Sequence, residues 1–65
     1  MEGINEKIRQ ARKQAHFTQA ALADIVGISR TYLAEIEGGR YNPSVRVLVA
    51  IAKACNQDLN FFVKV

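Results

Sequence analysis

The sequence is poor in cysteine and has no long uninterrupted hydrophobic run. Its single cysteine, Cys55, excludes an intrachain disulfide, and its apolar neighbours make it a core residue rather than a nucleophile. Lys, Arg, Asp or Glu interrupts every apolar stretch, so we expect no membrane span. The opening residues, MEGINEKIRQ, lack the apolar centre of a secretory signal. We therefore expect a cytoplasmic protein with no membrane partner.

The chain also lacks the residue groups of a metal site or a catalytic centre. His16 is the single histidine, and no second ligand stands at a metal-binding spacing from it, so a helix-capping role is the simpler interpretation. The acidic residues Asp24, Glu35 and Glu37 share no obvious cleft, and Cys55 lies far from His16 in the sequence. We expect no metal, no cofactor and no enzymatic activity.

What is present is the composition of a small basic globular protein. The 65 residues are 49% hydrophobic and 23% charged, which is typical of one folded domain spanning residues 1–65. The net charge of +3 favours an anionic partner such as nucleic acid. A core of this size is only marginally stable alone, and dimerisation is a common remedy.

Apolar spacing and capping residues predict four helices. The apolar residues of the first segment recur at offsets of four, three and four, which predicts an amphipathic helix over residues 4–14. A serine or threonine that can cap a helix precedes each of three further segments. These segments are residues 19–26, residues 30–37, and a strongly apolar one from residue 45 to near residue 56.

The last residues of the chain have two interpretations. Asp58 can cap a short fifth helix from Leu59 to about Phe62, whereas the alternation of apolar residues over 59–65 fits a strand equally well. In either form these apolar side chains are candidates for a dimer interface. The candidates are Leu59, Phe61, Phe62 and Val63.

The second and third predicted helices form a recognisable unit. Two short helices joined by a tight glycine turn make a helix-turn-helix. Ala23 is small enough for a close helix crossing, and Gly27, four positions later, can adopt the left-handed turn conformation. Leu33 and Ile36 supply apolar anchors on the second helix of the unit. The sequence therefore predicts a helix-turn-helix.

In such a unit the start of the second helix meets the base edges of DNA. Arg30 can donate two hydrogen bonds to a guanine, and Thr31 can offer its methyl group to a thymine. Glu35, one turn further, can accept a hydrogen bond from a cytosine. Other polar residues of the unit are candidates for contacts to the DNA backbone. They are Thr18, Gln19, Ser29, Tyr32, Arg40 and Asn42.

The stretch TQAALADIVGISRTYLAEIEGGRYNPS resembles the lambda-repressor-like, Xre-type helix-turn-helix family. The family opens its second helix with Gln, continues with Leu-Ala, Gly, a hydrophobic residue and Ser or Thr, and places Ile-Glu before a later Gly. The matching residues are Gln19, Leu22, Ala23, Gly27, Ile28, Ser29, Ile36 and Glu37. The segment SRTYLAEIE is also similar to the recognition helices of restriction–modification controller proteins.

This resemblance implies a compact all-α domain of four to five helices that binds a partly palindromic double-stranded DNA operator as a homodimer. It assigns base reading to Arg30, Thr31 and Glu35, and a structural ion pair to Arg12 and Glu37. The expected function is that of a sequence-specific transcription regulator. The alternative is an antitoxin, which binds a toxin as well as its own operator.

Overall fold

The computed structural model describes residues 3–63 of the chain. It contains four α-helices and one turn of 3₁₀ helix, and residues 3–63 include no strand. The elements are Ile4–Gln14 (α1), Gln19–Val26 (α2), Arg30–Glu37 (α3), Val45–Ala54 (α4) and Leu59–Phe61 (η1). The predicted all-α fold class with a helix-turn-helix is confirmed.

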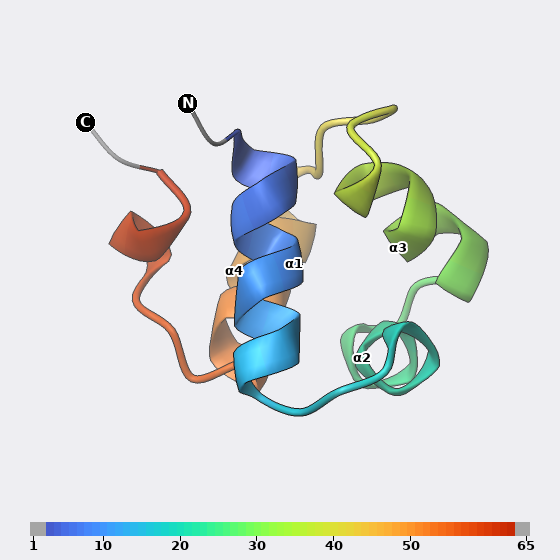
Figure 1. Ribbon diagram of the computed structural model, residues 1–65, viewed down its shortest axis with the longest axis horizontal. Helices are drawn as coiled ribbons and strands as arrows, with labels where there is room; N and C mark the ends of the chain where they lie inside the picture. Colours follow the sequence, from blue (N-terminus) through green and yellow to red (C-terminus); the bar gives the residue numbers. More distant parts are fainter. Residues whose placement is uncertain (1–2, 64–65) are drawn as a thin grey trace.

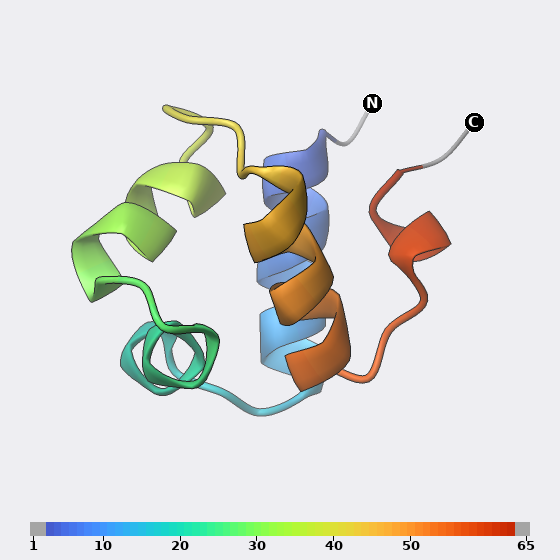
Figure 2. The same ribbon diagram turned by 180° about the vertical axis from the view of Figure 1, so that it is seen from behind.

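Two helices, α1 and α4, overlap at the centre of both views (Figure 1 and Figure 2) and the remaining elements flank them. Figure 1 shows α1 in front of α4, and Figure 2 shows the same pair from behind. α2 and α3 lie together on one side of this pair, and η1 lies on the other. α2 packs against both α3 and α4, α1 packs against α3, and η1 packs against α4. The helix-turn-helix is therefore supported by both central helices.

Hydroxyl side chains cap the N-termini of three helices, as predicted. The oxygens of Thr18, Ser29 and Ser44 accept hydrogen bonds from backbone N–H groups three residues later, at 3.0, 3.0 and 3.2 Å. Each such cap is worth about 1 kcal/mol, because it satisfies an N–H that has no partner within the helix. The bounds of α1, α2 and α3 are those predicted from the sequence.

Residues in the left-handed conformation end the helices. Gly27 follows α2 directly with φ of 85°, as predicted. After α1 and α4 the same role falls to residues that carry side chains, His16 with φ of 62° and Asn56 with φ of 56°. The next N–H groups, of Phe17 and Gln57, return to helix carbonyls five residues back at 3.1 and 2.9 Å. α4 therefore ends slightly before the predicted position.

Replacing His16 with glycine should stabilise the domain by about 0.5–1 kcal/mol. The left-handed conformation costs a residue with a Cβ about 1–2 kcal/mol, and glycine avoids this cost. Part of the resulting gain in stability is lost because glycine has greater conformational freedom in the unfolded chain. Urea denaturation followed by circular dichroism measures the change. His16→Ala, which keeps the Cβ, is the matched control and should bring no gain. If His16→Gly destabilises the domain, the side chain of His16 has a stabilising role.

The core draws residues from α1 to α4, from Cys55 directly after α4, and from the segment after η1. Its buried members are Ile8, Ala11, Leu22, Ala23, Leu33, Ile36, Leu48, Ile51, Ala52, Cys55 and Phe62. Burial raises the pKa of the Cys55 thiol, which the nearby carboxylate of Glu37 also raises and the cation of Arg12 lowers. Cys55 is thus the core residue that the sequence predicted.

The end of the described chain is helical rather than a strand, and it buries Phe62, which the sequence had placed at a dimer interface. Residues 59–61 form a single 3₁₀ turn rather than a strand, and the carboxylate of Asp58 caps it by accepting from the N–H of Asn60 at 3.0 Å. Phe62 is 5% exposed and belongs to the core of the single chain. Its assignment to a dimer surface is therefore corrected, because too little of the ring is left for a second copy to contact. Leu59 and Val63 are well exposed, Phe61 is partly buried, and all three stay candidates.

Candidate nucleic-acid interface

The turn between α2 and α3 is built from backbone hydrogen bonds. The N–H groups of Gly27 and Ile28 both donate to the carbonyl of Ala23, at 2.8 and 2.9 Å. The side chain of Ala23 is buried, which fits the close approach of the two helices. No heavy atom lies within 4 Å of the position that a Cβ on Gly27 would occupy. Gly27 is therefore required for its left-handed φ and not for lack of space.

α3 has a buried side and an exposed start. Leu33 and Ile36 are fully buried and anchor the helix to the core. Arg30 and Thr31, in its first turn, are exposed, and Glu35 is partly buried one turn later. The ring of Tyr32 is partly buried, with its centroid 6.3 Å from that of Tyr41 on the loop after α3. The two side chains with the strongest predicted base contacts are thus accessible to a ligand.

The other predicted contact residues divide into two groups. Thr18 and Ser29 accept hydrogen bonds as helix caps, yet each hydroxyl keeps its own hydrogen for an outside acceptor. Arg40 and Asn42 are exposed on the loop between α3 and α4. The backbone of that loop is fixed by the left-handed Gly39 and by the N–H of Arg40, which donates to the carbonyl of Glu35 at 2.9 Å.

Arg12 and Glu37 form a largely buried ion pair, as the family resemblance implies. Nε of Arg12 is 2.7 Å from Oε2 of Glu37, and Nη2 is 3.1 Å from Oε1, so the contact is bidentate. The remaining Nη1 donates to the carbonyl of Phe17 at 2.9 Å. Glu37 also accepts from the Gln19 amide at 3.1 Å. Glu37 is 5% exposed, so its charge serves to hold α1, α2 and α3 together.

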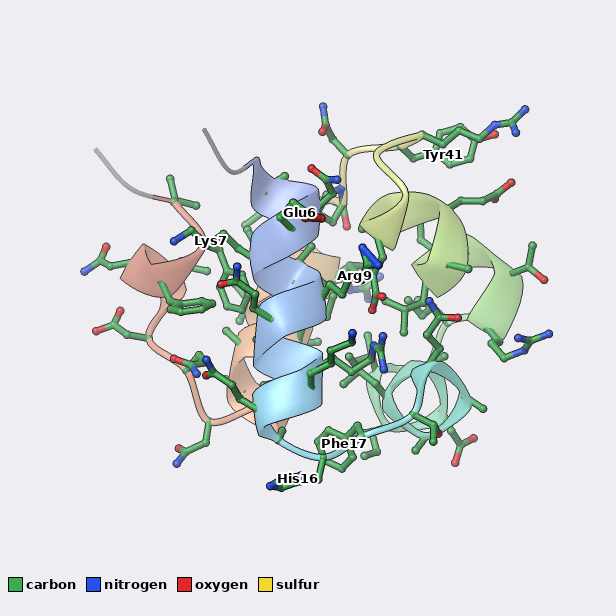
Figure 3. All side chains as sticks on the ribbon, in the orientation of Figure 1. Glu6, Lys7, Arg9, His16, Phe17 and Tyr41 are labelled. Carbon is green, nitrogen blue, oxygen red and sulfur yellow. The ribbon has the colours of Figure 1, made fainter. Side chains whose placement is uncertain are left out.

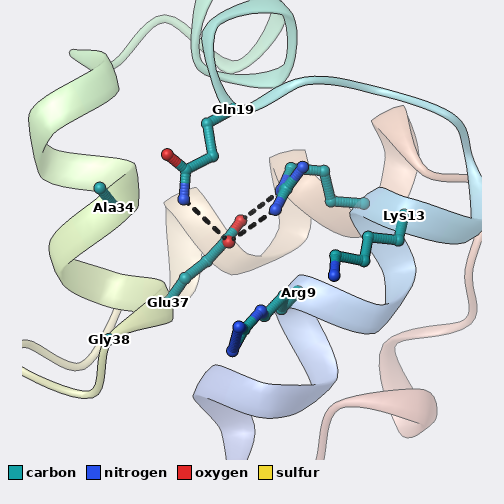
Figure 4. A pocket seen from close by; sticks show the side chains of 7 residues that line it. Arg9, Lys13, Gln19, Ala34, Glu37 and Gly38 are labelled. Atoms are coloured by element: carbon teal, nitrogen blue, oxygen red, sulfur yellow. Dashed lines mark hydrogen bonds and ion pairs between the residues drawn. The ribbon is translucent and has the colours of Figure 1, made fainter.

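A cleft between α1 and α3 lies beside this ion pair, and the sequence interpretation did not include it. Figure 4 shows Arg9 and Lys13 projecting from α1 on one side, with Ala34 of α3 and Gly38, directly after α3, opposite. Gln19 reaches into it from the start of α2. Its volume is about 330 Å³. We call it the α1–α3 cleft. The spacing of four between Arg9 and Lys13 indicates a shared helix face, but the sequence does not show that α3 packs opposite.

Metal and membrane features are not found in the part of the chain that the structure describes. No group of three or more His, Cys, Asp or Glu side chains among residues 3–63 is placed to hold a metal ion. No helix within those residues is both long and apolar enough to cross a bilayer. The candidate surface itself is made of polar and cationic side chains on α1, α2, α3 and the loop after α3.

A comparison with known families agrees with this geometry. The family model described as helix-turn-helix matches residues 8–62, which is nearly all of the described chain. The chain belongs to the helix-turn-helix family. The lambda-repressor-like, Xre-type resemblance predicted from the sequence is confirmed.

Relatives in this helix-turn-helix family include proteins of phages and archaea. The ImmF control region 10 kDa protein of Bacillus phage phi105 is 49% identical over 53 residues, which cover 82% of this chain and 59% of that protein. The immunity repressor protein of the same phage is 45% identical over 51 residues, covering 78% and 35%. The chain spans less than two thirds of either phage protein. An uncharacterized transcriptional regulator of Archaeoglobus fulgidus is 39% identical over 62 residues, covering 91% and 89%.

Solved structures of the helix-turn-helix family share the whole fold. The DNA-binding domain of the P22 c2 repressor matches with a TM-score of 0.91 at 30% identity, covering 97% of this chain and 83% of that one. The P22 c2 repressor in complex with a synthetic operator matches with a TM-score of 0.89 at 30% identity, covering 98% and 97%. The restriction–modification controller protein C.AhdI of Aeromonas hydrophila shares the fold, with a TM-score of 0.84 at 24% identity, covering 91% and 89%.

Proposed function

We propose that this chain is a sequence-specific DNA-binding transcription regulator. The observation that carries the proposal is the exposed first turn of α3, with Arg30 and Thr31, in a fold that matches a repressor bound to its operator. Related proteins named as transcriptional regulators and as an immunity repressor support the same function. On this proposal the protein acts by binding DNA and needs no catalytic centre, and its place is the cytoplasm.

The proposed mechanism uses two copies of the chain. A homodimer would present two α3 helices about one DNA turn apart, roughly 34 Å, to a partly palindromic operator. Arg30, Thr31 and Glu35 would read base edges in the major groove. Backbone contacts would supply affinity that falls steeply with salt, because each neutralised phosphate releases counterions. Exposed apolar side chains at the chain end, Leu59 and Val63, are the candidate contacts between copies.

The function is tested by selecting bound duplexes from a random DNA pool at near-physiological salt. Enrichment of a two-fold-symmetric sequence supports the regulator and its homodimer. Enrichment of an asymmetric sequence keeps sequence-specific binding and rejects the symmetric dimer. If a folded protein enriches nothing, DNA reading by this chain alone is wrong, and a toxin or other protein bound through Leu59 and Val63 becomes the function to test.

On the selected site, Arg30→Ala should weaken binding by about 1–3 kcal/mol, with little change on random DNA. The reason is that a guanidinium can donate two hydrogen bonds to one guanine, which random sequences seldom offer in register. Fluorescence anisotropy with both duplexes measures the two effects. Lys53→Ala is the matched control, because it removes an exposed cation from α4. Equal losses on both duplexes would contradict base reading by Arg30.

A further inference from the structure

The α1–α3 cleft carries more positive charge than its carboxylate can neutralise. Three cations, Arg9, Arg12 and Lys13, line it against one carboxylate, that of Glu37. That carboxylate already accepts two hydrogen bonds from Arg12 and one from Gln19. The charge of Arg12 is thus balanced, and the charges of Arg9 and Lys13 remain to attract an anion into the cleft.

We propose that the α1–α3 cleft binds a phosphate of the DNA backbone, with Arg9 and Lys13 as the donors. The proposal rests on the DNA-binding function proposed above and adds contact residues from α1 to it. Arg12 is assigned a structural role, because Glu37 balances its charge and three of its five N–H groups donate to Glu37 and Phe17. Arg12 lines the cleft, and Arg9 and Lys13 bind the phosphate.

Both donors are available at low cost. Arg9 is exposed, and its ion pair with Glu6, at 3.5 Å, joins two side chains that are about half exposed. Such surface pairs are worth about 0–1 kcal/mol, so a phosphate with a full negative charge can displace the carboxylate. Lys13 is exposed and makes no hydrogen bond or ion pair with any of the residues 3–63. Its ammonium group is therefore free to donate to a phosphate oxygen.

The position of the cleft favours DNA over a small diffusible anion. Gln19, at the start of α2, lines the cleft and is itself a predicted backbone contact. Its amide gives one hydrogen to Glu37 and retains a second, and Thr18 precedes it at the same helix end. The cleft thus adjoins the start of α2 and the end of α3. A strand that passes those helix ends can place a neighbouring phosphate between α1 and α3.

The charge on the other side of α1 provides an internal comparison. Lys7 projects away from the cleft towards η1, where its Nζ lies 5.1 Å from the centroid of the Phe61 ring (Figure 3). Arg9 projects towards α3 (Figure 3). One helix thus carries cations on two opposed sides, and the proposal assigns DNA contact to the Arg9 side alone.

The test is the salt dependence of DNA binding for the double variant Arg9→Gln/Lys13→Gln. Loss of one phosphate contact should reduce the slope of log affinity against log salt by about 0.9. The reduction should be equal on the selected operator and on random duplex, because a backbone contact carries no sequence information. The control, Lys7→Gln/Lys53→Gln, removes two positive charges from other faces and should leave the slope unchanged. Circular dichroism establishes that both variants are folded.

The outcomes separate this proposal from the function on which it rests. If wild-type protein binds duplex and the cleft variant keeps its slope, or changes it no more than the control does, the cleft assignment is overturned and the DNA-binding function stands. A loss confined to the operator also overturns it, because that result indicates base reading. If wild-type protein binds no duplex at low salt, the proposed function fails and the cleft proposal fails with it.

Discussion

Replacing Glu37 with alanine should destabilise the domain by about 3–5 kcal/mol, because the change leaves the guanidinium of Arg12 buried without its counter-ion. Arg12 would keep one contact, to the carbonyl of Phe17, and Gln19 would lose its acceptor. A domain of this size has a total stability of about 3–10 kcal/mol at ordinary values per residue. The variant should therefore lose a large part of its stability, and its unfolding midpoint should fall sharply. Urea and thermal denaturation followed by circular dichroism measure the loss.

Two further variants identify the cause of that loss. Glu6→Ala removes a carboxylate from an exposed ion pair with Arg9 and should change stability by less than about 1 kcal/mol. The double variant Arg12→Met/Glu37→Leu removes both buried charges and should recover a large part of the stability lost in Glu37→Ala. If Glu37→Ala behaves like Glu6→Ala, the ion pair does not hold the three helices together.

Truncation of Phe62 to alanine should cost about 3–5 kcal/mol, the usual range for a buried aromatic ring in a core. The ring is 5% exposed and meets the Phe61 ring edge-on, with centroids 5.2 Å apart. Its loss should leave a cavity between η1 and the central helices. Val63→Ala, at a side chain that is 46% exposed, is the control and should have little effect on the stability of the single chain.

The same pair of variants separates a core role from an interface role. Denaturation measures stability, and sedimentation at several protein concentrations measures association. We expect Phe62→Ala to lower the unfolding midpoint at every concentration, and Val63→Ala to weaken any dimer while the monomer stays folded. If Phe62→Ala leaves stability intact and abolishes only a dimer, Phe62 is an interface residue and its placement in the core is wrong.

Local patterns predicted most of the secondary structure of this protein. The starts of α2, α3 and α4 depend on a hydroxyl that bonds to an N–H three residues away, and such a bond can be read directly from Thr18, Ser29 and Ser44. The turn at Gly27 depends on a left-handed φ, which glycine adopts more readily than any other residue type. Both signals lie within a few residues of the feature that they determine.

The chain end shows where that local information stops. The apolar residues from Leu59 onward fit a short helix and a strand equally well, so their spacing does not decide between the two structures. The structure has a single 3₁₀ turn, which places Phe62 against the core and leaves Leu59 and Val63 exposed. Which apolar side chain is buried depends on where α4 lies, and that position is absent from the local pattern.

The candidate site divides in the same way. By itself the sequence determined the helix-turn-helix, the exposed first turn of α3 with Arg30 and Thr31, and the residues of the Arg12–Glu37 pair, because motif spacing within one short segment and family resemblance specify them. Only the tertiary structure decided that Gln19 bonds to Glu37 and that Arg9 and Lys13 face α3 across a cleft. These contacts join residues on separate helices, and only the packing of α1 against α2 and α3 brings them within reach.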